Sequence, residues 1–302
     1  MIDIVMRAGS FIAIIVLGYV LKRLGVFKQE DFGVLSKIAI RITLPCAIIV
    51  SFHGKVIDPA LLSLPLIAVA CGAVYVAAGY LLGKKRSREQ QAFDMVNLAG
   101  YNIGNFTIPF AQSFLGPMAV IAISIFDIGN AMVCLGGAYS MACMVKDGSR
   151  FSLMRVIRAL MKSVPFVVYL IVLAMYFLHI KTSAFVLSIA EIGSSANAFA
   201  AMFMIGVGFK LEAKREQLMT IARIVAVRYA AATVFALIFF FVLPFALEIR
   251  QALVILAFAP IGAAVPGFVG EMGGDIGLSS AINSICMVIS ITVIVCLLLV
   301  ML

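Results

Sequence analysis

Long apolar runs follow one another along almost the whole chain. A helix needs about 20 apolar residues to cross the hydrocarbon core of a bilayer. Ten such runs can be placed on the sequence, at 4–24, 33–53, 61–83, 91–115, 117–144, 153–178, 184–209, 219–247, 250–271 and 277–301. We therefore expect an all-α polytopic membrane protein with ten transmembrane helices.

The composition supports this interpretation. The 302 residues are 64% hydrophobic and 12% charged, whereas soluble domains are about 45–50% apolar and 25% charged. A water-soluble fold is excluded, and the short linkers between the runs predict a single membrane domain. The six cysteines lie inside apolar runs without a C-x-x-C spacing, so we expect them to be small core residues rather than metal ligands.

The loops between the runs alternate in charge. On one side they carry Lys22, Arg23, Lys28, Lys84, Lys85, Arg86, Arg88, Lys146, Arg150, Lys210, Lys214 and Arg215. On the other side they carry only Arg7, Lys55, Lys181 and Arg250. The positive-inside rule then predicts an inner (plasma) membrane protein with both termini outside. The formal charge of +9 is thereby explained by topology and by attraction to anionic lipid, and we expect no nucleic-acid partner.

The chain divides into two similar halves. Residues 1–144 and 153–302 each hold five spans, joined by a cytoplasmic linker at 145–152. Because five is odd, two similar halves must be inverted relative to one another in the membrane. Short matches fall at corresponding places, namely Val-Leu-Ser at 34–36 and 186–188, and Ile-Gly at 103–104 and 261–262.

The fourth span of each half is interrupted by helix-breaking residues. Segment 99–110 reads A-G-Y-N-I-G-N-F-T-I-P-F, and segment 257–270 reads A-F-A-P-I-G-A-A-V-P-G-F-V-G. A proline inside a helix removes a backbone donor and collides with the preceding turn. We expect both spans to unwind near mid-membrane and to cross there in an NhaA-like arrangement, which is typical of the central site of a transporter.

Helix N-termini that meet at such a crossing favour an anionic ligand, for example a carboxylate. The predicted substrate-binding residues are Asn102, Asn105, Thr107, Pro109, Pro260, Ile261, Gly262 and Pro266. The alternative is that the prolines only kink packed helices and that the asparagines form interhelical hydrogen bonds.

Ionisable groups inside the membrane are costly and are candidates for a function. Asp127 lies well inside the fifth span, with Asn130 three residues on and therefore on the same face. We expect this pair to take part in proton coupling or to line the cavity. Glu191 and Arg228 lie in the seventh and eighth spans, where each can pair with an opposite charge or meet a substrate.

The sequence resembles the auxin efflux carriers and their bacterial relatives, within the bile acid, arsenite and riboflavin transporter superfamily. The resemblance is carried by N-I-G-N-F-T-I-P at 102–109 and A-P-I-G-A-A-V-P-G-F-V-G-E at 259–271. Weaker similarities are Leu-Pro at 44–45 and Val-Arg-Tyr at 227–229. Asn102, Pro109, Pro260 and Pro266 fall on the crossover positions of this family.

The resemblance implies two inverted five-helix repeats, elevator-type alternating access, and secondary-active transport of a small organic anion such as malonate, malate or an auxin-like acid. It also implies a homodimer. The chain departs from the family pattern at 194–198 and 230–232, which lack a proline, and it lacks the long internal loop of the plant members. These departures argue against auxin itself as the substrate.

The alternative functions are those of an enzyme, a passive channel and a sodium-coupled symporter. The chain has no H-E-x-x-H or G-x-S-x-G motif and only two histidines, His53 and His179, so we expect no enzyme, no cofactor and no metal. A passive channel would use the same broken helices. A sodium-coupled organic-anion symporter would need several convergent oxygens, which side chains such as Asn105 and Asn197 can supply.

Overall fold

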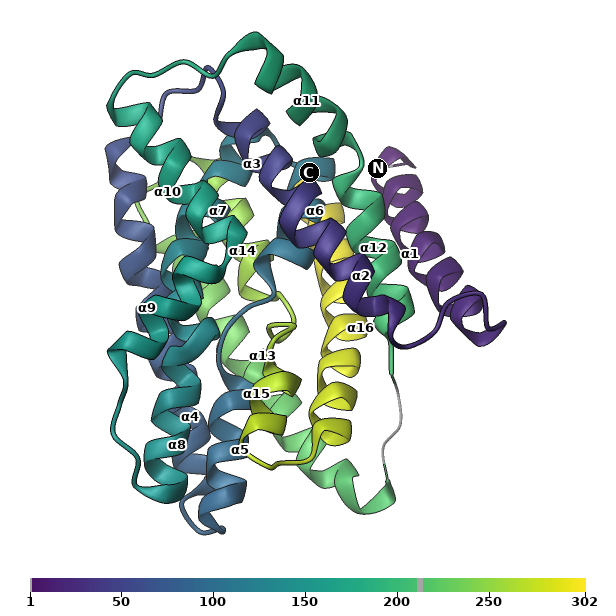
Figure 1. Ribbon diagram of the computed structural model, residues 1–302, viewed down its shortest axis with the longest axis vertical. Helices are drawn as coiled ribbons and strands as arrows, with labels where there is room; N and C mark the ends of the chain where they lie inside the picture. Colours follow the sequence, from purple (N-terminus) through teal and green to yellow (C-terminus); the bar gives the residue numbers. More distant parts are fainter. Residues whose placement is uncertain (1, 211–213) are drawn as a thin grey trace.

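The computed structural model describes residues 2–210 and 214–302, and every regular element in these ranges is helical (Figure 1). The first half contains α1 (Ile2–Arg23), α2 (Asp31–Ile38), α3 (Leu44–Phe52), α4 (Leu64–Gly83), α5 (Arg88–Leu98), α6 (Ile108–Phe114), α7 (Pro117–Met132) and α8 (Ala138–Asp147). The second half contains α9 (Leu153–Lys162), α10 (Val164–Phe177), α11 (Ala184–Ser195), α12 (Asn197–Gly208), α13 (Leu218–Phe241), α14 (Leu247–Ala257), α15 (Val265–Glu271) and α16 (Ile276–Met301). Short turns of other helix types are the π-helical η1 (Ala39–Thr43), η3 (Ile103–Thr107) and η4 (Val133–Gly137), and the 3-10 helical η2 (Pro59–Ser63) and η5 (Arg215–Gln217).

Seven helical stretches in the described residues are long and apolar enough to cross a membrane. They are Ile4–Arg23, Asp31–Phe52, Pro59–Gly83, Pro117–Asp147, Ala184–Gly208, Arg215–Phe241 and Ile276–Met301. The pair α9 and α10 passes the same test together but is bent by 80° between its two helices. The expected all-helical membrane architecture is confirmed at this level.

The fourth and ninth apolar runs are interrupted, as the sequence predicts. α5 ends at Leu98, and helical structure resumes in η3 at Ile103. α14 ends at Ala257, and α15 begins at Val265. In Figure 1, α5 and α15 lie in the lower half of the molecule and α6 and α14 in the upper half. The two unwound segments therefore pass each other near the middle.

The sixth run, 153–178, was expected as one span and is instead divided into two helices at a sharp corner. Ser163 ends α9 and caps α10, because its hydroxyl accepts a hydrogen bond from the amide of Phe166. Pro165 stands in the first turn of α10, where a missing backbone donor is harmless. The second run carries the π-helical turn η1, and the seventh is divided at Ala196.

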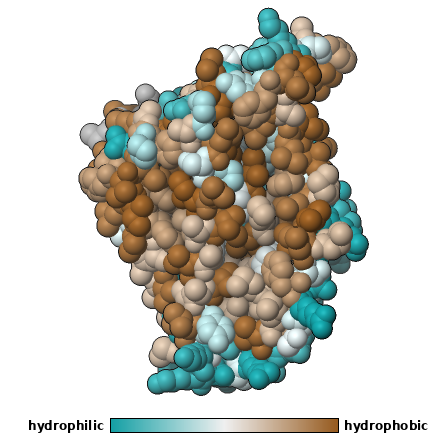
Figure 2. All heavy atoms as spheres, turned by 90° about the vertical axis from the view of Figure 1, so that its left-hand side faces the viewer, coloured by the Kyte–Doolittle hydropathy of each residue, from teal (hydrophilic) through white to brown (hydrophobic). Residues whose placement is uncertain are grey.

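Large apolar side chains cover much of the outside of the molecule. On α1, Ile12, Val16 and Val20 are each at least 42% exposed, far more apolar surface than a soluble protein leaves in contact with water. Figure 2 shows a broad hydrophobic band between hydrophilic residues gathered along the lower edge and at the upper edge. This is the surface that lipid chains would cover.

Glycines let two of the helices approach closely. A Cβ atom added at Gly206 of α12 would lie 2.1 Å from the carbonyl oxygen of Ile15 on α1, and one added at Gly18 would lie 2.6 Å from that of Phe203. Small residues at such contacts are typical of helix pairs in membranes, where packing replaces the hydrophobic effect. Backbone contact therefore joins α1 to α12.

Candidate functional site

The two unwound segments are joined by a hydrogen bond between their backbones. The amide of Asn102 donates to the carbonyl oxygen of Pro260 at 2.9 Å. Gly100 precedes this contact with a φ of +78°, a conformation that favours glycine. Pro260 has no backbone N–H to donate, so its backbone contributes only a carbonyl acceptor at the crossing.

Arg228 of α13 holds both segments at once. Its guanidinium donates to the carbonyl oxygens of Leu98 and Gly100, at 2.7 and 3.0 Å, and to those of Ala259 and Pro260, at 2.8 and 3.1 Å. The Arg228 side chain is 1% exposed. A fixed fork of donors suits this role, since one guanidinium can satisfy several acceptors in different directions.

Aromatic rings complete the surroundings of Arg228. Its guanidinium carbon lies 5.1 Å from the centre of the Tyr75 ring and 5.4 Å from that of Tyr101. A cation above a ring face is attracted by the negative centre of the ring. The charge is therefore balanced by carbonyl dipoles and ring faces rather than by a carboxylate.

The placement of Arg228 affects the balance of helix dipoles at the crossing. The carbonyl oxygens that it binds lie at or just after the C-terminal ends of α5 and α14, which carry the negative ends of the helix dipoles. The N-terminal end of η3, which continues into α6, also lies at the crossing. The guanidinium therefore offsets the negative helix ends, and the positive N-terminal end is left to act on a ligand.

The side chain of Asn130 on α7 forms hydrogen bonds with the first unwound segment. Its Oδ1 accepts from the amide of Tyr101 at 2.9 Å, and its Nδ2 donates to the carbonyl oxygen of Tyr101 at 3.0 Å. The same Nδ2 donates to Asp127 Oδ1 at 2.8 Å, and Asp127 Oδ2 accepts from the Tyr169 hydroxyl at 2.9 Å. Asp127 thus connects α10 to the unwound backbone through Asn130.

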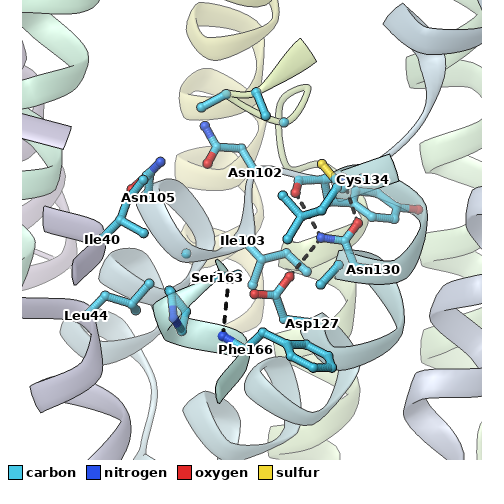
Figure 3. Close-up of a pocket in the computed structure, with 18 of the residues that line it drawn as sticks. Ile40, Leu44, Asn102, Ile103, Asn105, Asp127, Asn130, Cys134, Ser163 and Phe166 are labelled. Atoms are coloured by element: carbon cyan, nitrogen blue, oxygen red, sulfur yellow. Dashed lines mark hydrogen bonds between the residues drawn. The ribbon is translucent and has the colours of Figure 1, made fainter. Parts of the chain in front are cut away.

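A cavity of about 140 Å³ lies beside the crossing. Asn102, Asn105, Asp127 and Asn130 line it, together with residues 262–264 that precede α15. Figure 3 shows Asp127 and Asn130 on one side and Asn105, next to Ile40, on the other, with Asn102 between them.

Two buried amide groups in this cavity have no hydrogen-bond partner among the described residues. They are Asn102 Nδ2 and Asn105 Oδ1, on side chains that are 4% and 6% exposed. A buried polar atom without a partner costs about 1–3 kcal/mol, so such groups in a cavity are suited to a ligand or water. One is a donor and the other an acceptor.

A second cavity, of about 250 Å³, lies on another side of the crossing. Asn102 and Ala263 line both cavities, so the crossing separates them. Pro266 lines the second cavity, together with Lys210 and with Asn283 of α16.

The remaining predicted residues are placed differently. Thr107 is buried and donates to the carbonyl oxygen of Asn102 at 3.4 Å, and Pro109 and Ile261 are buried away from both cavity linings. Gly262 lines the first cavity. Glu191 is exposed on α11 and does not line either cavity.

Some lining residues were not predicted from the sequence. Tyr169 and Ser163 come from α10 and its cap, and Cys134 comes from η4. A Cβ atom added at Gly100 or Gly262 would lie 2.9 or 2.4 Å from Cys134 Sγ, so this thiol is wedged between the two segments. An apolar run containing one cysteine gives no sign of such a position.

Comparisons with known proteins agree with this architecture. Residues 4–146 match the model of a family described as membrane transport protein. An uncharacterized transporter of Methanothermobacter thermautotrophicus is 23% identical over 128 residues, which are 41% of this chain. That match spans 42% of the relative's own length. The family and the relative both indicate a membrane transporter. The matched residues include α5, α6 and the break between them. This match confirms the resemblance to the auxin efflux carrier family.

Proposed function

We propose that this membrane transporter carries a small organic anion by a secondary-active mechanism, with the crossing as its substrate site. The observation that carries the proposal is the cavity at the crossing, whose lining residues Asn102 and Asn105 hold a buried amide donor and a buried amide acceptor without partners. Arg228 binds the C-terminal carbonyl oxygens, so the unbalanced dipole at the crossing is positive. Such a site favours a carboxylate, for example that of malonate, malate or an auxin-like acid.

The topology that we propose has ten spans in two inverted repeats. It counts the seven apolar stretches, the bent pair of α9 and α10, and the two interrupted runs as one span each. Both chain ends lie in the upper half of Figure 1, while the loop between α4 and α5, with Lys84 and Arg86, lies at the bottom. The positive-inside rule then puts the lower end in the cytoplasm and both termini outside, in the plasma membrane. The homodimer and the elevator-type movement expected from the resemblance stay predictions.

Proton coupling is favoured over sodium coupling. A sodium ion needs several oxygens that can converge on it. Both carboxylate oxygens of Asp127 already accept hydrogen bonds, from Asn130 and Tyr169, and Asn130 Oδ1 accepts from Tyr101. Proton uptake by Asp127 would change these contacts without requiring a coordination shell, and would weaken the link between α10 and the crossing.

The test is electrical recording from proteoliposomes that contain the purified full chain. A panel of mono- and dicarboxylates is applied with a pH gradient, with a sodium gradient, or with neither. We expect a saturable current for at least one carboxylate, driven by the pH gradient and reduced at least tenfold by N102A. The control is T233A, which changes an exposed residue on α13.

Loss of the Asn102 side chain removes no hydrogen bond from its Nδ2 atom, so N102A is expected to fold. A sodium-driven current would favour the symporter. A current that neither saturates nor supports counterflow would indicate a channel. The proposal fails if no carboxylate gives a current that N102A reduces.

A further inference from the structure

A third cavity is lined by one face of α9, a short helix with a basic side and an apolar side. Val156 and Leu160 are buried in a small apolar cluster with Ala131 and Phe166. Three basic residues, Arg155, Arg158 and Lys162, follow a spacing of three and four residues. Such a spacing puts them along one side of a helix.

The cavity of about 460 Å³ collects these basic side chains. Arg155, Arg158 and Lys162 all line it, and Glu271 of α15 is the acidic residue in its lining. Three cations and one carboxylate leave a net positive lining. Lys146 of the neighbouring α8 is engaged elsewhere, since its amine donates to the carbonyl oxygen of Met272.

The three cations differ in how they are held. The guanidinium carbon of Arg155 lies 5.2 Å from the centre of the Tyr139 ring, which itself packs against Phe268 with ring centres 5.2 Å apart. Arg158 and Lys162 are exposed and have no ion-pair partner in the described part of the chain. Two of the three charges are therefore available to an anion.

This cavity adjoins the cavity at the crossing. Leu135 lines both of them. Lys162 lines the basic cavity, and the next residue, Ser163, lines the crossing cavity. The corner between α9 and α10, where the chain turns by 80°, thus stands between the two cavities.

We propose that the basic cavity beside α9 is the vestibule through which an organic anion reaches the crossing, with Arg158 and Lys162 as the residues that attract it. This inference rests on the proposed function and adds the entry route to it. A phospholipid headgroup is the other anion with suitable chemistry. The soluble anion is favoured because the cavity adjoins the crossing. Of the exposed apolar residues of α9, Met154 lines the cavity, whereas Leu153, Ile157 and Met161 do not.

The electrostatic part of the proposal can be tested without a known substrate. Ala159 lines the cavity, and an A159C substitution in a variant without the native cysteines provides a thiol there. The rates of modification by the anionic reagent sulfonatoethyl methanethiosulfonate and by its cationic trimethylammonioethyl analogue are compared in proteoliposomes. The control thiol is A60C, at an exposed residue in η2.

We expect the ratio of the anionic to the cationic rate to fall by about fivefold when R158Q and K162Q are added to A159C, and to stay unchanged for A60C. An unchanged ratio at A159C would overturn the proposal. Because this readout involves no transport, it stays valid if no carboxylate is carried and the proposed function itself fails.

The transport part uses any carboxylate that gives a current. For that anion, R158Q with K162Q is expected to raise the half-saturating concentration at least fivefold when it is applied from the α9 side, and to weaken the dependence on ionic strength. T233A is expected to change neither. If the double variant leaves transport unchanged but loses phosphatidylglycerol in native mass spectrometry, the cavity holds a lipid headgroup and the vestibule is disproved.

Discussion

The amide of Asn102 is bonded to the carbonyl oxygen of Pro260, which lies 158 residues further along the chain. This contact joins the two unwound segments directly, with no side chain between them. Arg228 binds the carbonyl oxygen of the same Pro260 together with those of Leu98 and Gly100. The crossing is therefore one hydrogen-bonded unit, and substitutions in it are expected to act on both segments together.

Replacing Arg228 is expected to destabilise the whole fold. R228M would remove a donor from four buried carbonyl oxygens. That of Pro260 keeps its hydrogen bond from the Asn102 amide, whereas those of Leu98, Gly100 and Ala259 lose their partner, at a cost of about 1–3 kcal/mol each. R228K keeps the charge but loses the fork geometry, so we expect a smaller loss. The measurement is thermal unfolding in detergent, followed by size-exclusion chromatography.

The matched control is R41Q, since Arg41 is an exposed arginine in η1. We expect its unfolding temperature to stay within a few degrees of the wild type. A stable R228M with unchanged transport would show that the carbonyl oxygens are satisfied in another way.

Asp127 and Tyr169 allow charge and hydrogen bonding to be separated. D127N removes the ionisable group and keeps one acceptor oxygen. That oxygen can accept from the Tyr169 hydroxyl, which lies 2.9 Å from the carboxylate, while the hydrogen bond from Asn130 Nδ2 is lost. We expect D127N to bind the anion but to lose the response of transport to a pH gradient. Y169F removes one hydrogen bond and keeps the carboxylate, so its current should still follow the gradient. Equal gradient dependence in D127N and the wild type would exclude Asp127 as the coupling group.

Cys134 and Gly262 are expected to behave as a coupled pair. A methyl group at Gly262 would lie 2.4 Å from Cys134 Sγ, so G262A should disturb the crossing and lower both stability and transport. C134A removes the obstructing sulfur, and the double variant should recover part of the loss. Residues in contact usually show coupling energies of about 0.5–3 kcal/mol in such a cycle. Additive effects would show that the obstruction is relieved by rotation of the thiol.

Close packing of α1 against α12 gives a test of the fold that is independent of transport. G206A would bring a methyl group to 2.1 Å from the carbonyl oxygen of Ile15, and we expect it to cost about 1–3 kcal/mol. G9A is the matched control, because Gly9 also lies on α1 and has nothing within 4 Å of an added Cβ atom. We expect G9A to be neutral or slightly stabilising, since alanine is the better helix former. Equal unfolding temperatures for the two variants would contradict the observed contact.

Sequence patterns predicted the breaks because their causes are local. Pro260 and Pro266 disrupt helical hydrogen bonding within a few residues, and Gly100 permits the turn that ends α5. The cavity lining was anticipated in part for the same reason, since Asn102, Asn105 and Gly262 belong to these segments.

The roles that depend on distant contacts were not predictable. Arg228 was expected to pair with an acid or meet the substrate, whereas it binds backbone carbonyl oxygens up to 130 residues away. Glu191 was expected to be a coupling candidate, but it lies exposed on α11 outside both cavities at the crossing. A hydropathy pattern shows which residues enter the membrane but not which face of a helix meets a distant segment.

The reliance on Arg228 has a consequence for how the chain is made. The carbonyl oxygens of Leu98 and Gly100 are synthesised about 130 residues before the guanidinium that binds them. Until α13 has entered the bilayer, the break after α5 therefore has acceptors that lipid cannot satisfy. The newly made first half must keep this segment hydrated, or shielded by the insertion machinery, while it waits for the second half. The hydrogen bonds between Arg228 and this segment can therefore form only after the first half of the chain has already been inserted in the membrane.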